Sequence, residues 1–480
     1  MREARGGAQI KADICVIGGG SGGLSVAAGT AQMGASTVLF ERGKMGGDCL
    51  NYGCVPSKAL LAAARAKAAV EQAGVFGVHA EAPRVAFNEV HDHVHGVIAA
   101  IAPHDSVERF EGLGVTVFQQ AARFTGPQEV TAADGTVVRA RRFVIATGSS
   151  PAAPPIEGIA GIDYLTNETV FDLTECPEHL IVIGGGPIGL ELAQAHRRLG
   201  ARVTVLEMYT VLGRDDPELA EIVKARVLAE GIEIHEGVEV VRFERNGGGV
   251  TAVAASDGQE HRIGGSHLLV ATGRAPTVDG LDLEKAGVAY TRSGVEVDRR
   301  LRTTNKKIFA IGDVAGGYQF THVASYHAGI VIRNALFRLP AKVDEKAIPW
   351  VTYTDPELAG VGLTEAQARE RHGEVRVLRW PFKDNDRAQA ERTTEGTIKV
   401  VTDRRGRVLG AGIVGSHAGE LLQPWVLAIE RGLKVGAMAN LVVPYPTLGE
   451  VNKRVAGSFY TPTLYSERTR RIVRLLRYLG

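Results

Sequence analysis

The stretch Ile14-Cys15-Val16-Ile17-Gly18-Gly19-Gly20-Ser21-Gly22-Gly23 decides the first part of the fold. A short apolar strand leads into the pattern G-x-G-x-x-G, formed by Gly18, Gly20 and Gly23, and a helix of small residues follows. In this order the first glycine makes a tight turn, the second lets the backbone approach a pyrophosphate, and the third lets helix and strand pack closely. The sequence therefore predicts a dinucleotide site where this strand ends.

A second copy of the pattern lies further along the chain. In the first copy, the next strand, residues 36–40, ends at Glu41, an acid suited to bind a ribose hydroxyl. The second copy comprises a strand at 179–183, the glycines Gly184, Gly186 and Gly189, a helix over 190–199, and a strand at 202–206 that ends at Glu207. A carboxylate accepts a hydrogen bond from the 2′-hydroxyl of NAD but repels the 2′-phosphate of NADP. Glu207 therefore favours NADH, with Arg214 expected to be a solvated loop residue.

Two cysteines five positions apart, Cys49 and Cys54, precede a helical run that contains Lys58. Pro56 follows Cys54 closely, and proline is tolerated in the first turn of a helix, so Cys54 is expected where the helix begins. Unpaired N–H groups and the helix dipole lower the pKa of a thiol there from about 8.5 toward neutrality. The pattern favours a redox-active pair over two thiols buried in a core.

Length and charge limit the function classes. A chain of 480 residues predicts about three domains, and its net charge of +1 argues against nucleic acid as a partner. The polar start, residues 1–11, lacks the apolar core of a signal peptide, and no later run is long enough to span a bilayer. We expect a cytoplasmic enzyme, a compartment in which paired cysteines are more often catalytic than structural.

The order of strands predicts an α/β fold with two Rossmann-like domains and a C-terminal α+β domain. Two apolar strands end alike, at Thr147-Gly148 and Thr272-Gly273, as domain crossovers would, and a third ends at Asp313. After Ile348 the glycine turns disappear. We predict a first dinucleotide domain over 1–155, interrupted by a second over 156–278 and resumed over 279–347. The part devoted to association is expected over 348–480.

Together these motifs resemble the flavoprotein disulfide reductases, over nearly the whole chain, with lipoamide dehydrogenase and mercuric reductase as the most similar branch. The resemblance implies a homodimer in which the first glycine motif binds FAD and the second binds NAD(H). It implies that Cys49 is the interchange thiol, that Cys54 touches the flavin, and that the two form a disulfide. The flavin-binding residues that it implies also include Glu41, Thr147, Gly148, Asp313, Gln319, Phe320, Thr321 and His322, and Gly273 joins the NAD site. Lys58 and Glu191 match an ion pair near flavin N5.

The C-terminal region departs from the dithiol-oxidising members of the family. Their acid/base is a His-Pro-Thr segment followed by Glu, whereas this chain has Tyr445-Pro446-Thr447 and Glu450. A tyrosine with a pKa of about 10 does not readily accept a proton at neutral pH, where histidine, with a pKa of about 6.5, does. Efficient dihydrolipoamide oxidation is therefore not expected. The chain also lacks a vicinal cysteine pair like that of mercuric reductase, because no cysteine follows Cys176.

Residues 466–480 read as a basic helix with an apolar stripe through Ile472, Leu475, Leu476 and Leu479. The stripe is expected to pack on its own protein, with weak contact to an anionic membrane surface as the alternative.

The electron acceptor stays open among three hypotheses. The first is reduction of a disulfide or a thiol-reactive metal ion through the cysteine pair, with no resident metal. The second is a thiol-independent quinone reductase or transhydrogenase. The third is a slow redox-sensing binding protein.

Overall fold

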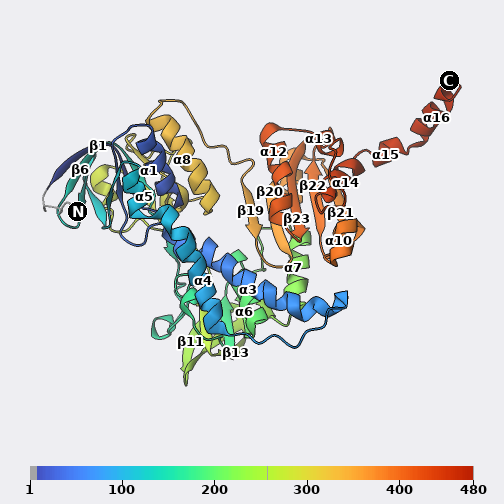
Figure 1. Cartoon of the computed structure of the whole chain (residues 1–480), viewed down its shortest axis with the longest axis horizontal. Coiled ribbons are helices and arrows are strands. Elements are labelled where there is room, and N and C mark those ends of the chain that lie inside the picture. Colours follow the sequence, from blue (N-terminus) through green and yellow to red (C-terminus); the bar gives the residue numbers. More distant parts are fainter. Residues whose placement is uncertain (1–7, 257, 479–480) are drawn as a thin grey trace. The chain divides into compact units, whose positions relative to one another are not determined.

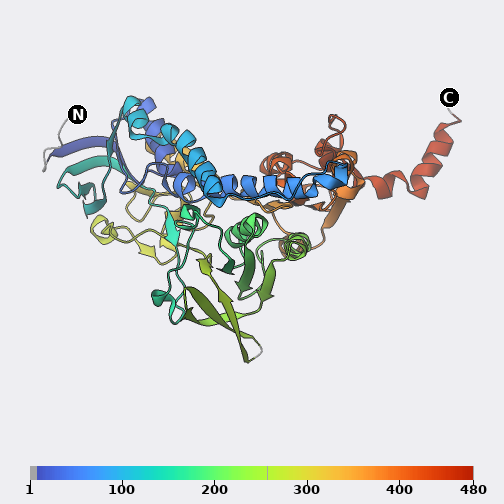
Figure 2. The same cartoon turned by 60° about the horizontal axis from the view of Figure 1, so that its bottom comes forward.

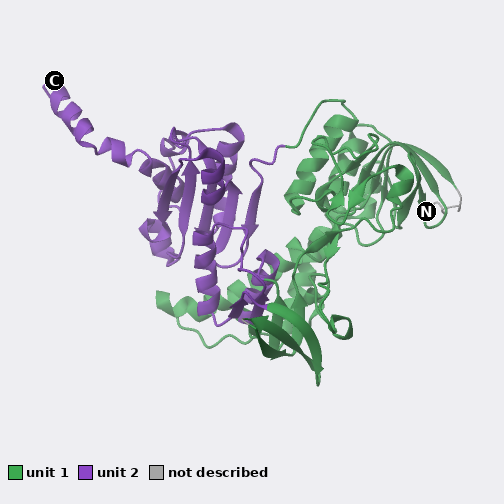
Figure 3. Cartoon of the chain, turned by 180° about the vertical axis from the view of Figure 1, so that it is seen from behind, with its two compact units in different colours: residues 1–184, 198–203, 239–343 green, residues 185–197, 204–238, 344–480 purple. Residues whose placement is uncertain are grey.

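The computed structural model describes residues 8–256 and 258–478, and these form two compact units (Figure 3). Unit 1 comprises residues 1–184, 198–203 and 239–343. Unit 2 comprises residues 185–197, 204–238 and 344–480. The second glycine motif lies at the boundary in the sequence, because Gly184 belongs to unit 1 and Gly186 to unit 2.

Unit 1 is built on a seven-stranded sheet in the order β3-β2-β1-β6-β5-β4, with β18 also paired to β6. β1, β2, β3, β6 and β18 pair in parallel, whereas β4 and β5 add an antiparallel extension. The strands are β1 (Gln9–Ile17), β2 (Thr37–Phe40), β3 (Val115–Phe118), β4 (Ala122–Gly126), β5 (Glu129–Ala132), β6 (Val137–Ile145) and β18 (Ile308–Ala310).

β1 is buried on both faces, as a central parallel strand requires. Ile14 and Val16 belong to one apolar cluster, together with residues of α1, α5 and α8, whereas Cys15 and Ile17 belong to another, on the opposite face. Helix α1 packs along α8, and α3 lies beside α4 (Figures 1 and 2). The helices of this part are α1 (Ser21–Gln32), α2 (Gly47–Asn51), α3 (Cys54–Gln72), α4 (Phe87–Ile101), α5 (Val107–Gly112) and α8 (Thr321–Ala335).

The remaining strands of unit 1 form smaller sheets. β8 and β14 pair in parallel, β11, β12 and β13 form an antiparallel sheet, β7 pairs with β15, and β16 pairs with β17. Their bounds are β7 (Ser149–Pro151), β8 (His179–Ile183), β11 (Glu239–Asn246), β12 (Gly249–Ser256), β13 (Gln259–Gly265), β14 (His267–Val270), β15 (Arg274–Pro276), β16 (Tyr290–Thr291) and β17 (Gly294–Val295).

Unit 2 contains a five-stranded antiparallel sheet in the order β19-β20-β23-β22-β21, with α7 packed against β20 and β23. Its core includes the fully buried Trp425. β10 pairs in parallel with β9. The strands are β9 (Arg202–Glu207), β10 (Glu233–Glu236), β19 (Pro349–Thr352), β20 (Glu357–Gly362), β21 (Arg376–Pro381), β22 (Thr397–Thr402) and β23 (Val408–Gly415). The helices are α6 (Pro187–Leu199), α7 (Pro217–Ala229), α9 (Glu365–His372), α10 (Asp386–Glu391), α11 (Ala418–Leu421), α12 (Gln423–Arg431), α13 (Gly436–Ala439), α14 (Glu450–Ser458), α15 (Thr461–Leu464) and α16 (Glu467–Leu476).

The α/β class and the placement of both glycine motifs between strand and helix are confirmed. The predicted helix start at position 190 is wrong, because α6 begins at Pro187, inside the glycine motif. Proline supplies a helical φ and lacks only an N–H that is unpaired in the first turn. The expectation that the C-terminal stripe packs on its own protein is also wrong for the described part of the stripe, because Leu475 remains 68% exposed. Leu479 lies outside the described residues.

Candidate active site

The first glycine motif forms a tight cradle at the end of β1. Gly18 has φ +110°, and an added Cβ would lie 2.3 Å from the carbonyl oxygen of Ala146. A Cβ on Gly23 would lie 1.8 Å from the carbonyl oxygen of Gly18. Only glycine fits at these two positions, so the backbone of the motif stays accessible at the start of α1. This cradle fits the pyrophosphate of a dinucleotide.

Glu41 is held in place by the same motif. One carboxylate oxygen, Oε2, accepts a hydrogen bond from the N–H of Gly19 at 2.5 Å, and Oε1 accepts from the N–H of Gly43 at 2.6 Å. A carboxylate has about four acceptor positions, so two remain for ribose hydroxyls. The second glycine motif, in unit 2, has the equivalent hydrogen bond, because Oε2 of Glu207 accepts from the N–H of Gly185 at 2.7 Å. Both acids fit the ribose role predicted for them.

The cysteine loop adjoins the first glycine motif. The N–H of Gly46 donates to the carbonyl oxygen of Gly19 at 2.9 Å, and Gly20 and Gly46 form a β-bridge. The next residues form α2, which carries Cys49, and α3 then begins at Cys54 as predicted. This bridge fixes the two thiols beside the dinucleotide cradle.

Cys49 and Cys54 are free thiols that hydrogen-bond to one another. The bond from Cys49 is the largest cause that lowers the pKa of Cys54 to about 6, and Thr321 and the positive charge of Lys58 act in the same direction. The pKa of Cys49 is raised by the same bond and by burial. The lowered pKa of Cys54 has the direction predicted from sequence, but neighbouring side chains account for it. At neutral pH the pair therefore holds its negative charge on Cys54.

Thr321 lies at the start of α8, with its Oγ1 3.4 Å from Sγ of Cys54. The segment from 319 to 322 was predicted to present its backbone to the flavin, and the structure adds a hydroxyl contact to the thiol. The neighbouring rings of Phe320 and His322 stack with centroids 5.2 Å apart. The start of α8 therefore lies against the redox pair, and it contributes a side chain that can donate a hydrogen bond to a thiolate.

A network that sequence reasoning missed links the cysteine loop to Asp313. Ser149 Oγ donates to Oδ2 of Asp313 at 2.5 Å, and Arg274 Nε donates to the same Ser149 oxygen at 2.7 Å. Arg274 Nη2 also pairs with Asp48 Oδ1 at 3.0 Å. Asn167 joins the network by donating to Asp48 Oδ1 at 3.0 Å and by accepting from Arg274 Nη1 at 3.2 Å. Asp48 directly precedes Cys49, so this network ties the loop of the redox pair to the end of β18.

Arg274 and Asp313 are both shielded from solvent. The side chain of Arg274 is 11% exposed, and burial raises the pKa of Asp313 while the hydroxyl of Ser149 opposes the shift. His327 supports the backbone beside this acid, because its Nδ1 accepts from the N–H of Gly312 at 3.2 Å. Burial lowers the pKa of His327 to about 4, so the ring stays neutral and acts as an acceptor. Asp313 therefore has a fixed position from which to bind a hydroxyl-rich chain.

The remaining predicted residues are distributed over both units. Thr147 Oγ1 donates to the carbonyl oxygen of Thr277 at 2.7 Å in unit 1. In unit 2, the buried Glu191 accepts at Oε1 from the N–H of Tyr353 at 2.9 Å. Lys58 belongs to unit 1, and its pairing with Glu191 stays a prediction. Arg214 is exposed, as its expected place in a solvated loop requires.

Tyr445 does not have the properties of a base at neutral pH. Its hydroxyl donates to Oδ2 of Asp386 at 2.9 Å, and this bond raises the pKa of Tyr445 above its ordinary value of 10.0. Glu450, at the start of α14, lies 3.6 Å from Arg454 within the same helix. The tyrosine therefore carries its proton wherever the enzyme works near neutrality.

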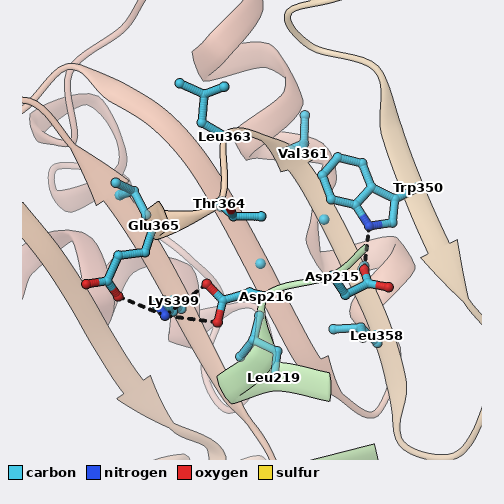
Figure 4. A pocket seen from close by; sticks show the side chains of 15 residues that line it. Asp215, Asp216, Leu219, Trp350, Leu358, Val361, Leu363, Thr364, Glu365 and Lys399 are labelled. Carbon is cyan, nitrogen blue, oxygen red and sulfur yellow. Dashed lines mark hydrogen bonds and ion pairs between the residues drawn. The ribbon is translucent and has the colours of Figure 1, made fainter. Parts of the chain in front are cut away.

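Unit 2 also contains a small cavity, of about 20 Å³, beside the start of α7 (Figure 4). Lys399, whose side chain is 6% exposed, lies at its edge within 2.9 Å of the carboxylates of Asp216, Glu218 and Glu365. Trp350 Nε1 donates to Oδ1 of Asp215 at 2.7 Å on the other side. A space of this size holds about one water, so no nucleotide or disulfide fits there. The cluster joins α7 to the five-stranded sheet.

The described residues include neither a cluster suited to a metal ion nor a membrane-spanning helix. No group of three or more His, Cys, Asp or Glu side chains in residues 8–256 and 258–478 is placed to hold a metal ion. Over the same residues no helix combines the length and the apolarity needed to cross a bilayer.

Comparison with known proteins shows the family. The family described as "Pyridine nucleotide-disulphide oxidoreductase" matches residues 12–328, and its dimerisation domain matches residues 348–456. Mercuric reductase from Streptomyces lividans is 37% identical over 93% of this chain and 96% of its own length. Dihydrolipoyl dehydrogenase from Geobacillus stearothermophilus is 34% identical over the same shares of the two chains.

Solved structures agree with these sequence matches. The HOCl-induced flavoprotein disulfide reductase RclA from Escherichia coli, in its Cu(II) complex, has a TM-score of 0.84 at 26% identity, covering 93% of this chain and 99% of its own. LpdA from Mycobacterium tuberculosis has a TM-score of 0.85 at the same identity and coverage. The chain therefore belongs to the pyridine nucleotide-disulphide oxidoreductases and is an FAD-dependent enzyme that uses NAD(H).

Proposed function

We propose that this enzyme takes electrons from NADH and delivers them, through a disulfide between Cys49 and Cys54, to a disulfide or a thiol-reactive metal ion. The observation that carries the proposal is the thiol pair itself, with Cys54 acidic and in contact with Thr321. Bound FAD supplies the step between a two-electron hydride donor and a disulfide. For a disulfide acceptor the sum is one NADH, one proton and one disulfide giving NAD and two thiols.

The roles of the two thiols follow from their different acidity. When the Cys49–Cys54 bond opens, it accepts two electrons, and the hydrogen bond from Cys49 favours the negative charge on Cys54. Lys58 and Thr321 stabilise that charge. Cys49 then passes its proton along their hydrogen bond to Cys54 as its sulfur attacks the acceptor, forming a mixed disulfide with release of one acceptor thiolate, or a sulfur–metal bond. Cys54 closes the cycle by attacking the Cys49 sulfur, which reforms the disulfide and releases the second thiolate, or the metal with the bonding electron pair, while the Cys54 proton goes to the departing thiolate or to water.

The C-terminal segment argues against dihydrolipoamide as the electron donor. Oxidation of a dithiol needs a base that removes a proton at neutral pH, and such a base contributes about a hundred- to ten-thousandfold in rate. The bond from Tyr445 to Asp386 keeps the tyrosine protonated. We propose that the family's dimerisation domain assembles a homodimer in which Tyr445 and Glu450 lie at the acceptor site.

The relatives support the two classes of acceptor. The names of the compared sequences include mercuric reductase and dihydrolipoyl dehydrogenase, and the RclA structure is a Cu(II) complex. A soft metal ion is a natural target for a thiolate. Among the cysteines of residues 1–480, we propose Cys49 as the one that meets a metal ion.

A panel of acceptors tests the proposal. The purified enzyme is assayed with NADH and with NADPH against oxidised lipoamide, glutathione disulfide, mercuric ion and quinones, and each assay is repeated with Cys49→Ser. We expect NADH-driven turnover with a disulfide or the metal ion, and its loss in the variant. Undiminished rates in Cys49→Ser would show a thiol-independent route, such as quinone reduction, and would refute the proposal.

Tyr445→His tests the missing base separately. Histidine titrates near neutrality, so we expect dihydrolipoamide oxidation at pH 7 to rise by about a hundredfold or more. Tyr445→Phe is the matched control, because it removes the bond to Asp386 without adding a base, and it should leave that rate low. A Tyr445→His enzyme no faster than wild type would show that the base is not what limits this reaction.

A further inference from the structure

The last described helix, α16 (Glu467–Leu476), lies beyond both family matches, the second of which ends at residue 456. Its start is well formed, because the side chain of Ser466 accepts a hydrogen bond from the N–H of Thr469. In Figure 1 the helix extends from α15 away from the five-stranded sheet of its own unit. No residue of α16 is buried.

The two faces of α16 differ in character. Ile472, Leu475 and Leu476 lie three or four positions apart, on one side of a helix, and are 46%, 68% and 56% exposed. Leu464 and Tyr465, just before the helix, add exposed apolar area. A contiguous exposed apolar face on a short helix indicates that something else covers it.

The rest of the helix is strongly basic, with Arg470, Arg474 and Arg477 across from the apolar side chains and Arg468 and Arg471 next to them. Five arginines occur between 468 and 477, namely Arg468, Arg470, Arg471, Arg474 and Arg477, against a single acid, Glu467. Glu467 interacts with Arg470 at 3.4 Å and with Arg474 at 3.7 Å. Among the described residues, no carboxylate lies within ion-pairing distance of the other three. The helix therefore carries an excess of four positive charges in a chain whose total is only +1.

We propose that α16 binds the surface of an anionic lipid bilayer. A helix with a basic polar face and an apolar strip lies in the plane of the interface, where its apolar side chains enter the acyl boundary and its arginines meet the head groups. A second copy of this chain is the weaker candidate, because an identical helix would bring another four positive charges to the contact. An anionic lipid surface can bind the arginines and bury the apolar side chains at the same time.

The binding is expected to be weak and salt-dependent. Each arginine near an anionic leaflet contributes about fivefold in affinity, and the attraction fades within a Debye length, which falls from about 10 Å at 0.1 M salt to about 3 Å at 1 M. Full-length, FAD-loaded enzyme should float with vesicles of roughly one-third phosphatidylglycerol at about 0.1 M salt. It should not float with pure phosphatidylcholine vesicles, or at about 1 M salt.

Two double variants separate charge from apolar contact. Arg471→Gln with Arg477→Gln should weaken flotation by about 25-fold, and Leu475→Ser with Leu476→Ser by about tenfold or more. The matched control, Arg404→Gln with Arg405→Gln, removes the same charge from an exposed turn of unit 2 and should float like wild type. NADH oxidation should stay within about twofold in all three, because none of these residues belongs to the glycine motifs, the thiol pair or their hydrogen-bond partners.

Three results would overturn the proposal. The first is full-length enzyme that fails to float with the anionic vesicles at low salt. The second is flotation that is equal with neutral vesicles or in the 471/477 variant. The third is a chain lacking residues 466–480 that sediments as a monomer where the full chain is a dimer, because a second copy would then be what covers the apolar face. None of these results bears on the cysteine chemistry, which the acceptor panel tests independently.

Discussion

The acidity of Cys54 can be tested by changing its neighbour. Its pKa of about 6, against an ordinary value of 9.0, depends first on the hydrogen bond from Cys49 and then on Thr321 and Lys58. Cys49→Ala removes the largest of these causes. We expect the titration midpoint of Cys54 in the reduced protein to rise from about 6 toward 9.0, and to rise further than in Thr321→Val or Lys58→Met.

The titration midpoint of Cys54 must be measured over a pH series, because the alkylation rate at a single pH does not report the pKa. With a pKa of 6, about nine-tenths of Cys54 is thiolate at pH 7, and with a pKa of 9 only about one-hundredth is. However, a thiolate of higher pKa is intrinsically more nucleophilic, by about 20- to 30-fold over three pKa units. The two effects nearly cancel, so the alkylation rate at pH 7 would fall only by about fourfold. The pH at which the rate becomes half-maximal reports the pKa alone.

The assay is alkylation of the reduced enzyme across a pH series, with the modified cysteine assigned by tandem mass spectrometry. Cys176 serves as an internal reference, because burial raises its pKa and it should react only at higher pH in every variant. The direction of the Cys54 pKa shift also predicts how the stability of the fold depends on pH. A thiol whose pKa is lowered in the folded state stabilises the fold fully above pH 9, and this contribution is lost as pH falls through about 6. A wild-type midpoint near 9, or an unchanged midpoint in Cys49→Ala, would refute the reasoning.

Three further substitutions test other parts of the structure. Lys399→Met leaves three carboxylates uncompensated and should lower the free energy of unfolding by about 3–5 kcal/mol, against less than about 1 for the half-exposed control Lys346→Met, both measured by chemical denaturation. Gly18→Ala should lose bound flavin, measured as absorbance per polypeptide, whereas Gly161→Ala, with open space at its Cβ, should keep it. Glu207→Ala should raise kcat/KM for NADPH relative to NADH by about tenfold, since like charges about 4 Å apart repel by about 1 kcal/mol in water and about 4 near a protein surface. Unchanged values in any of the three would contradict the assigned role.

The parts of the site that sequence could predict are those encoded by short segments. The strand, the glycines and the helix start around Gly18 follow one another within about ten residues, so their order can be read directly from the sequence. The carboxylate of Glu41 accepts a hydrogen bond from the N–H of Gly19, within the same motif. The second copy repeats this with Glu207 and Gly185. The helix start at Cys54 is equally local, because Pro56 fixes the first turn. Such features recur at short, fixed spacings, so the sequence alone carries them.

The network around Arg274 could not be predicted in the same way. Its partners Asp48, Asn167, Ser149 and Asp313 come from segments up to 265 positions apart, and each alone reads as an ordinary polar residue. The position of Arg274, directly after a strand that ends in Thr-Gly, is the only signal in the sequence. Arg274 bridges these residues only because the fold buries it among them, and its burial depends on the folded sheet.

The charges of the site bear on the reduced state of the thiol pair and on which substrates suit it. Lys58, Thr321 and the hydrogen bond from Cys49 all favour a thiolate at Cys54, which is the state left after the disulfide accepts two electrons. Asp386 keeps the proton on Tyr445, so the residue in the place of the family's base does not assist dithiol oxidation at neutral pH. The first feature stabilises the reduced pair, and the second withholds the base that oxidation of a substrate dithiol would need. They argue against dihydrolipoamide as the electron donor, and they leave the choice between a disulfide and a soft metal ion to the shape of the site beyond Cys49.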